Sequence, residues 1–243
     1  MNYAVIIPAR YSSSRYPGKP LIDLAGKSMI QHVWERCVAA VGDKLVYIAT
    51  DDERISNHCS SFTSRLVATS TQCRTGTDRV AEAARLLKLD FAINVQGDEP
   101  LIEPSDILAV RDTFESGTWE VVNAMCPVRS EEEFRSPTIP KVVATPANRL
   151  LYMSRSGIPG CKSGEFKWGW KQICIYAFSQ MALEQFAAQP SKTPLEEQED
   201  IEILRFLELG YEVQMVKVNE GSIAVDTPED RERVLHVLHN QSR

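Results

Sequence analysis

The sequence predicts an α/β protein in which helices flank a mostly parallel sheet. Over the first hundred residues, short apolar runs of strand length alternate with amphipathic runs of helical spacing. That order produces parallel strands joined by right-handed crossovers. The 243 residues are also enough for one large α/β core. We therefore expect a single domain over residues 1–243, with residues of about 120–180 forming a smaller extension.

Four strands and three helices are expected to alternate along residues 1–100. A helix over residues 27–40 is indicated by apolar side chains at helical spacing between Met29 and Cys37. Another helix is expected to begin near Arg54, after an acidic segment that suits its N-terminus. A third is expected to begin at residue 77 or 78 and to run through Leu87. The predicted strands are residues 4–7, 45–49, 64–68 and 91–95.

The second half of the chain is less regular. Residues 196–209 are expected to form one strongly acidic helix that ends at Gly210, and residues 228–239 a last helix. Residues 156–170 contain four glycines, one proline and two tryptophans, a composition that predicts a loop. The predicted strands are residues 121–128, 141–145, 150–153, 171–178 and 212–218.

The composition excludes several classes of function. The net charge of -6 disfavours a nucleic-acid partner, because a phosphate backbone requires a broad basic surface. No apolar run approaches the ~20 residues of a membrane span, so membrane insertion is not expected. The six cysteines form no C-x-x-C pair, and the four histidines do not cluster with them. We therefore expect no zinc site, and reduced thiols in the cytoplasm.

Residues 8–20 give the strongest indication of a ligand site. They follow directly on the first strand and contain Arg10, Arg15 and Lys19, together with three serines and Gly18. Open α/β sheets bind ligands at the carboxyl ends of their strands, and fixed positive charge with hydroxyl donors suits a polyphosphate. An ordinary solvated loop is the alternative. The segment matches neither the Walker A pattern nor G-x-G-x-x-G.

Two aspartates follow short apolar segments and are candidate metal ligands. Asp98 stands just beyond the strand at residues 91–95, after Gly97, and Asp226 follows Ala224-Val225. Two carboxylates beside a triphosphate suit Mg²⁺, which keeps few protein oxygens and completes its shell with water and phosphate. For Asp226 the alternative is a helix N-cap, since the segment Asp-Thr-Pro-Glu also suits a cap.

Other polar groups give weaker signals. Residues 73–79 place hydroxyls, a glycine and arginines at a helix N-terminus, which suits either polar recognition or a simple cap. Arg155 at a strand end could pair with a substrate carboxylate. Glu199 and Glu202 could hydrogen-bond sugar hydroxyls, although most acidic runs are solvated faces. Nucleophilic catalysis has little support, because no G-x-S-x-G motif occurs.

Several motifs in a fixed order give a resemblance that covers nearly the whole chain. They are Ile-Ile-Pro-Ala-Arg-Tyr-Ser-Ser-Ser-Arg-Tyr-Pro-Gly-Lys-Pro-Leu, Ala-Thr-Asp-Asp, Thr-Gly-Thr-Asp-Arg, Asn-Val-Gln-Gly-Asp-Glu-Pro, Lys-Val-Val, Tyr-Met-Ser-Arg and Val-Asp-Thr-Pro-Glu-Asp. Together they closely resemble the 3-deoxy-manno-octulosonate (KDO) cytidylyltransferases, the CMP-KDO synthetases of lipopolysaccharide synthesis.

The resemblance implies a Rossmann-like nucleotidyltransferase fold, a requirement for Mg²⁺ and a homodimer whose small extension contributes to dimerisation and sugar binding. In such enzymes the anomeric hydroxyl of a sugar acid attacks the α-phosphate of CTP, and pyrophosphate leaves. The implied catalytic residues are Lys19, Asp98 and Asp226, of which the two aspartates would bind the metal. The implied nucleotide-binding residues are Ala9, Arg10, Arg15, Lys19, Arg74 and Thr75. The implied sugar-binding residues are Gln96, Arg155, Gln172, Tyr176, Glu199 and Glu202.

The chain departs from the family pattern mainly on the sugar side. Gln172 stands where the family usually has His, Cys174 interrupts an apolar-Gly-Ile-Tyr run, Ile203 replaces a frequent Gln, and Thr75 replaces a usual Ser. Sites built on hydrogen bonds to a substrate can discriminate strongly, so a modified or amino-substituted acid stays open as the substrate. Two competing functions are transfer of a nucleotide to a sugar 1-phosphate and nucleotide binding without catalysis.

Overall fold

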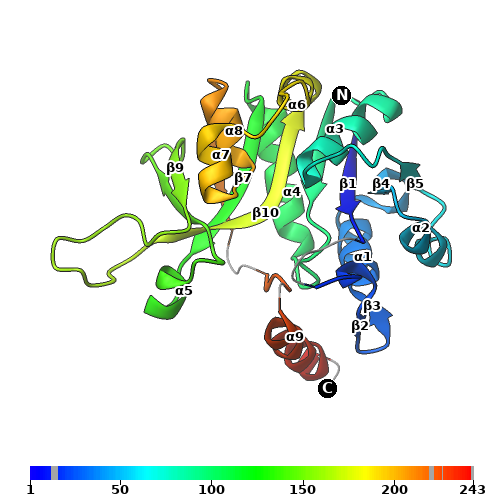
Figure 1. Cartoon of the computed structure of the whole chain (residues 1–243), viewed down its shortest axis with the longest axis horizontal. Helices are drawn as coiled ribbons and strands as arrows, with labels where there is room; N and C mark the ends of the chain where they lie inside the picture. The colour runs from blue at the N-terminus through cyan, green and yellow to red at the C-terminus, as the bar shows by residue number, and fades with distance from the viewer. Residues whose placement is uncertain (12–15, 219–221, 226, 242–243) are drawn as a thin grey trace.

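A central sheet of nine strands carries helices on both faces (Figure 1). The computed structural model describes residues 1–11, 16–218, 222–225 and 227–241. The main order of strands is β11 (Val213–Lys217), β7 (Val121–Pro127), β10 (Trp170–Ser179), β6 (Phe91–Val95), β1 (Tyr3–Ala9), β4 (Val46–Thr50) and β5 (Leu66–Ala68). Strand β8 (Lys141–Ala144) pairs with β10 and with β9 (Leu150–Ser154).

The prediction of a mostly parallel sheet is confirmed for the central strands. Strand β1 pairs in parallel with β4 and β6, β4 with β5, and β11 with β7. Strand β10 is the exception, because it runs antiparallel to both of its neighbours β6 and β7. The antiparallel strand brings residues 172–176 to the same edge of the sheet as the end of β6.

Alternation along β1 divides the core between the two faces of the sheet. Ala4 and Ile6 pack in the cluster that includes α3 (Gly76–Leu87), α6 (Gln180–Ala187) and α8 (Ile203–Glu208). Val5 and Ile7 pack in the cluster on the other face, with α1 (Met29–Val41) and α4 (Pro104–Ser116). A strand buried on both faces reads as a continuous apolar run, as it does here.

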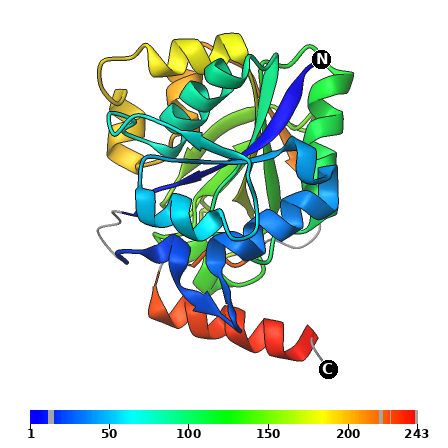
Figure 2. The ribbon, with the colours of Figure 1, turned by 90° about the vertical axis from the view of Figure 1, so that its right-hand side faces the viewer.

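The remaining elements lie around this core. They are α2 (Glu53–Cys59), α5 (Glu131–Arg135), α7 (Pro194–Glu199), α9 (Pro228–Gln241), the 3-10 turns η1 (Lys19–Leu21) and η2 (Asp43–Leu45), and the paired strands β2 (Asp23–Leu24) and β3 (Lys27–Ser28). Helix α9 lies beneath the sheet beside β2 and β3 (Figure 2). Val225 and Val234 from this C-terminal segment pack with Leu24, Met29 and Leu101.

The prediction of one acidic helix over residues 196–209 is wrong. The segment forms two short helices, α7 and α8, because Asp200 adopts a left-handed backbone with φ 51° and ends α7. Nor is the segment a solvated face along its length, since Glu196 is completely buried. Helices α4, α5 and α6 are absent from the predicted set. The predicted loop is confirmed, since residues 155–169 form a long connection that reaches out beside α5 (Figure 1).

Candidate functional site

A polar cavity of about 620 Å³ lies where β1 and β6 end and β10 begins. Seven of the residues predicted for the site line it: Arg10, Gln96, Asp98, Arg155, Gln172, Tyr176 and Glu202. Segments far apart in sequence meet here, since the wall also contains residues from 130–140 and from 222–233. The position matches the rule that open α/β sheets bind ligands beyond the carboxyl ends of their strands.

Asp98 and Lys19 form an ion pair at one side of the cavity. Lys19 Nζ donates to Asp98 Oδ2 at 2.8 Å, and the Asp98 side chain keeps 30% of its exposure. Gly97 lets the backbone approach β1, because a Cβ atom there would lie 3.2 Å from the Pro8 carbonyl oxygen. The loop after β6 is therefore held against the end of β1.

The two other predicted groups of this region, Arg15 and Asp226, lie outside the described residues. The chain segment next to Asp226 is nevertheless placed. Val225, which precedes it, donates its backbone N–H to the Asp98 carbonyl at 2.9 Å. The two segments that carry the predicted metal ligands thus run side by side in the described part of the chain.

The start of α3 forms another part of the site. Arg10 Nη1 donates to the Arg74 carbonyl at 2.9 Å. Thr75 and Asp78 form a reciprocal capping box, so Thr75 serves as the N-cap that the sequence offered as one alternative. Its neighbour Gly76 leaves room for Gln96, because a Cβ atom at Gly76 would lie 2.9 Å from Gln96 Nε2.

Glu202 occupies the free N–H groups at this helix N-terminus. Its carboxylate accepts from Gly76 N at 3.2 Å and from Thr77 N at 2.8 Å, an arrangement that the helix dipole favours. Arg74 turns away from the cavity, since its guanidinium donates to the carbonyls of Gln189 and Pro190. It lines a separate cavity of about 430 Å³ between α3 and α6.

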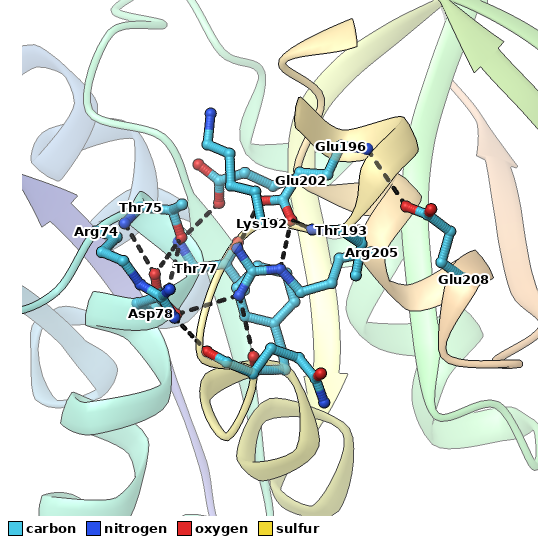
Figure 3. A network of polar contacts seen from close by, with 12 residues as sticks. Arg74, Thr75, Thr77, Asp78, Lys192, Thr193, Glu196, Glu202, Arg205 and Glu208 are labelled. Atoms are coloured by element: carbon cyan, nitrogen blue, oxygen red, sulfur yellow. Dashed lines mark hydrogen bonds and ion pairs between the residues drawn. The ribbon is translucent and has the colours of Figure 1, made fainter. Parts of the chain in front are cut away.

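A buried ionic network ties α3 to α7 and α8 (Figure 3). Arg205 donates to both carboxylate oxygens of Glu196, at 2.5 and 2.6 Å, and to the Phe186 carbonyl at 3.0 Å. Its Nη1 also lies 3.5 Å from Asp78 Oδ1. The Arg205 and Glu196 side chains have no exposed surface. Arg205 on α8 thus joins Glu196 of α7 to Asp78 of α3, and Glu202, just before α8, binds the start of α3.

Arg155 is held by backbone carbonyls from two segments. Its guanidinium donates to the carbonyls of Glu199 at 2.5 Å, Asp200 at 2.8 Å and Pro137 at 3.0 Å. Lys141 Nζ donates to the Arg155 carbonyl at 2.6 Å, and burial lowers the pKa of Lys141 to about 8. Arg155 therefore joins the break between α7 and α8 to the loop before β8.

Glu199 lies behind Arg155 rather than among the residues that line the cavity. Its carboxylate accepts from Ser154 Oγ at 2.7 Å and from Arg155 N at 2.8 Å. Burial acts to raise the pKa of Glu199, but these hydrogen bonds outweigh it and leave the pKa below its usual value. Ala9, Lys19 and Thr75 are likewise outside the set of lining residues.

Strand β10 builds the opposite wall with Gln172, Cys174 and Tyr176. Gln172 Nε2 donates to Asn123 Oδ1 at 3.0 Å. Burial raises the pKa of Tyr176 well above its ordinary value, so its hydroxyl stays protonated. Pairing between β10 and β7 shifts register between Ile173 and Tyr176, which indicates a bulge of the kind found beside ligand sites.

Sequence reasoning missed Glu99, a buried acid on the cavity wall. Its side chain is 3% exposed, and its Oε1 accepts from Cys174 N at 2.9 Å. Burial, reinforced by the neighbouring Asp98 charge, raises the pKa of Glu99 to about 7. The signal in the sequence is its place directly after Asp98, at the end of an apolar strand.

Carboxylates outnumber cations on this wall. Among the described lining residues there are seven acids, Asp98, Glu99, Glu132, Glu133, Asp200, Glu202 and Asp230, and four bases, Arg10, Arg155, Lys171 and Arg233. Within the described ranges, no three His, Cys, Asp or Glu residues are grouped as a metal would require. None of the helices in these ranges combines the length and apolar character needed to cross a bilayer.

A mostly parallel sheet with a polar cavity at its strand ends, beside Lys19 and Asp98, defines a nucleotide-handling α/β enzyme of the nucleotidyltransferase type. Comparison with known proteins specifies the family. The family model described as "Cytidylyltransferase" matches residues 4–217, and the chain belongs to this family.

Relatives of two kinds match almost the whole chain. It is 40% identical to the 3-deoxy-manno-octulosonate cytidylyltransferase of Parabacteroides distasonis, over 99% of this chain and 100% of the relative. It is 41% identical to the 8-amino-3,8-dideoxy-manno-octulosonate cytidylyltransferase of Shewanella baltica, over 95% of this chain and 96% of the relative.

A solved structure matches the fold over its full length. It is CMP:2-keto-3-deoxy-manno-octonic acid synthetase complexed with CTP, with a TM-score of 0.91 and 34% identity, over 99% of this chain and 100% of that chain. The resemblance stated from the sequence motifs is therefore confirmed at the level of family and fold.

Proposed function

We propose that this protein transfers CMP from CTP to the anomeric hydroxyl of a 3-deoxy-ulosonic acid, KDO or a close analogue, and releases pyrophosphate for the synthesis of a surface glycan. The observation that carries the proposal is the ion pair at 2.8 Å between Lys19 and Asp98, of which Asp98 lines the cavity. Full-length relatives that are named as cytidylyltransferases for such acids support the same activity.

The residues present fit a requirement for Mg²⁺. Asp98 offers a partly exposed carboxylate beside the cavity, and the backbone bond from Val225 to Asp98 brings the segment that carries Asp226 alongside. We propose these two aspartates as the residues that would hold the ion. When bound, Mg²⁺ would neutralise charge on the triphosphate.

The cations at the end of β1 are proposed to bind the triphosphate. Arg10 lines the cavity and Lys19 lies behind Asp98, so both can neutralise the charge that develops when pyrophosphate leaves. We assign Ala9, Arg15, Arg74 and Thr75 to the nucleotide as well. For Arg74 the backbone is the contact we favour, because its side chain is turned toward residues 189 and 190.

The opposite wall is proposed to bind the sugar acid. Gln96, Gln172 and Tyr176 line the cavity with hydrogen-bonding groups. Arg155 and Glu202 line it too, but each is already hydrogen-bonded to backbone groups. We propose that Glu199 acts from behind, by holding Arg155.

A sugar 1-phosphate fits this wall less well than a sugar acid does. A phosphate dianion would meet Glu99 and Glu202 among the described lining residues, and like charges that share a site repel. An inactive nucleotide-binding protein would have no use for the Lys19–Asp98 pair. Relatives with both hydroxylated and aminated substrates in their names leave those two acids as the candidates.

A homodimer in the cytoplasm completes the proposal. Leu151 on β9 and Trp168 in the loop before β10 are 53% and 57% exposed, and apolar side chains of this size favour an interface. All six cysteines are free thiols, which suits a reducing compartment. Sedimentation equilibrium tests the dimer, and the mass of a single chain would contradict it.

The test of the activity is pyrophosphate release from CTP with Mg²⁺ and a panel of acceptors. The panel contains KDO, its 8-amino analogue and several sugar 1-phosphates, with UTP in place of CTP as a control. We expect release with at least one sugar acid and none with the sugar phosphates. No release with any sugar acid would refute the proposal.

A further inference from the structure

Asn123 is a buried amide whose orientation is fixed by its neighbours. It lies on β7 with no exposed surface. Its Nδ2 donates at 2.9 Å to two carbonyls of β10, those of Ile173 and Ile175. In the flipped orientation its oxygen would face both carbonyl oxygens, and two acceptors repel one another. Asn123 Oδ1 must therefore point away from the backbone of β10, where it can accept a hydrogen bond.

The fixed oxygen of Asn123 determines how Gln172 is turned. The two side chains meet at 3.0 Å, with Gln172 Nε2 donating to Asn123 Oδ1. A flip of the Gln172 amide would place its oxygen against Asn123 Oδ1. Gln172 Nε2 therefore makes the contact with Asn123, and Gln172 Oε1 takes no part in it. No described residue donates a hydrogen bond to Gln172 Oε1. This oxygen is also absent from the set of buried side-chain atoms without a partner, so it keeps exposed surface. The cavity wall at Gln172 thus presents a hydrogen-bond acceptor.

A buried carboxyl group, that of Glu99, contacts β10 two residues further along the strand. Cys174 N donates to Glu99 Oε1 at 2.9 Å, whereas Glu99 Oε2 has no hydrogen-bond partner in the described part of the molecule. Both Gln172 and Glu99 line the cavity. A ligand group that lies against Gln172 Oε1 must supply a hydrogen, because an acceptor that a ligand covers without pairing it costs free energy.

The charge of the wall decides between the two common hydrogen donors of a sugar, a hydroxyl and an ammonium. Seven acids face four bases around the cavity. Four of the acids already meet a base: Asp98 meets Lys19, Glu133 meets Lys171, Asp200 meets Lys192 and Asp230 meets Arg233. Glu99, Glu132 and Glu202 have no cation within ion-pair distance among the described residues, so an excess of negative charge remains. An ammonium offers three donors and a positive charge, whereas a hydroxyl offers one donor and no charge.

We propose that Gln172, held by Asn123, is a specificity-determining residue that selects a sugar acid bearing an amine over its hydroxylated counterpart. The inference rests on the proposed function and narrows its substrate. Gln172 acts as a neutral acceptor for the ammonium, and the surplus of carboxylates on the wall supplies the attraction. The anomeric hydroxyl and the acid group of the substrate are shared by both candidates and play no part in the selection.

The test compares kcat/KM for the amine-bearing and hydroxylated sugar acids in wild-type protein and in variants of Gln172. Gln172→Met keeps the length of the side chain and removes the acceptor. Gln172→Lys keeps a donor for Asn123 Oδ1 but presents a cation to the cavity. Gln185→Met is the matched control, because Gln185 is exposed on α6 and lines neither cavity.

We expect wild-type protein to prefer the amine-bearing sugar acid by about tenfold or more, as a hydrogen bond to a charged group allows. Gln172→Met should remove most of that preference, Gln172→Lys should reverse it, and Gln185→Met should keep it. Because the readout is a ratio of two substrates on one protein, loss of stability in a variant does not change its meaning.

The outcomes distinguish failure of the proposed selectivity from failure of the proposed activity. Equal or better use of the hydroxylated acid by wild-type protein would overturn the selectivity and leave the cytidylyltransferase activity in place. An amine preference that survives in both Gln172 variants would overturn the role of Gln172. Pyrophosphate release with neither acid would overturn the activity and the selectivity together.

Discussion

Two charged regions of this protein lie close together and are built from the same residue types, yet their polar atoms are used differently. In the network of Arg205, Glu196 and Asp78, every charge meets an opposite charge or a backbone group within the described structure. On the cavity wall, Gln172 Oε1 and Glu99 Oε2 have no donor among the described residues.

The difference indicates that the Arg205 network stabilises the fold and that the cavity wall is built to bind a ligand. Arg205 and Glu196 are fully buried, and breaking such a pair leaves an uncompensated charge in the interior. Atoms left unpaired at a cavity have a cost in the free protein that a ligand can remove. Stability should therefore depend on the Arg205 network, and activity on the cavity wall.

The largest effect is expected from Asp98→Asn. The substitution preserves shape but removes the negative charge beside Lys19, so turnover should fall by about three orders of magnitude, the scale of a lost electrostatic group in a water-poor site. The thermal midpoint should stay close to that of wild-type protein. Steady-state pyrophosphate release and a melting curve measure the two quantities.

Asp112→Asn is the control for that substitution, because Asp112 lies on α4 and its side chain is 62% exposed. This variant should retain wild-type turnover. If the turnover of Asp98→Asn stays within a few-fold of wild type, the role assigned to Asp98 is wrong. The conclusion that activity depends on the cavity wall would then lose its main support.

Arg205→Met should have the opposite signature. Glu196 and Asp78 would lose their buried cation, and the free energy of unfolding should fall by about 3–5 kcal/mol. The remaining folded protein should keep a turnover near that of wild type. Urea denaturation gives the stability, and the activity per folded molecule gives the turnover.

A double variant tests whether the loss comes from the unpaired charge. Glu196→Met together with Arg205→Met removes both partners of the closest pair, and apolar residues often replace such pairs at little cost. We expect the double variant to recover most of the stability lost in Arg205→Met. A double variant as unstable as the single one would show that packing around Arg205, not charge, stabilises the helices.

The sequence predicted the sheet better than it predicted this network. Strand β6 matches its predicted range, because an apolar run of strand length bounded by polar residues leaves little ambiguity. The acidic segment misled the prediction, since the burial of Glu196 depends on Arg205 and Asp78, which local pattern does not bring together. The left-handed conformation of Asp200 could not be predicted either, because its carbonyl is held by Arg155, which follows β9 and is distant in sequence.

For the site, the motifs predicted which residues gather and missed how they are oriented. Asp98, Gln96 and Gln172 line one cavity as expected. Arg155, predicted to hold a substrate carboxylate, has its guanidinium bonded to backbone carbonyls in this structure. Its role and that of Asp226 remain predictions, the latter because Asp226 lies outside the described residues.

Asp106 is a buried acid outside both regions. The residues that shift its pKa, Glu103 and Ser105, include no cation. Burial, with repulsion from Glu103, raises the pKa of Asp106 to about 6. The folded protein then binds more protons than the unfolded chain between about pH 4 and pH 6, so its stability falls as the pH rises through this window.

Asp106→Asn should accordingly stabilise the protein at pH 7, by about 1–3 kcal/mol. The gain should shrink below pH 6 and vanish only well below the ordinary Asp pKa of 3.8, where the wild-type carboxyl is neutral in both states. Urea denaturation at a series of pH values measures it. A gain that is independent of pH would show that the charge of Asp106 is not what burial penalises.

The smallest effect is expected at Thr75, where the two regions touch. Thr75 caps α3 through its hydroxyl, which accepts from Asp78 N at 3.1 Å and donates to Asp78 Oδ2 at 3.0 Å. Thr75→Ala should lower the free energy of unfolding by about 1 kcal/mol, the usual cost of losing such a cap. Thr75→Ser keeps the hydroxyl and should stay within about 0.5 kcal/mol of wild type.

Because the hydroxyl is kept, we expect KM for CTP to be alike in wild-type protein and Thr75→Ser, and to rise in Thr75→Ala, where the start of α3 is loosened. A rise in KM for Thr75→Ser, with stability unchanged, would instead place the Thr75 methyl group against the nucleotide and extend the cavity wall into the structural network.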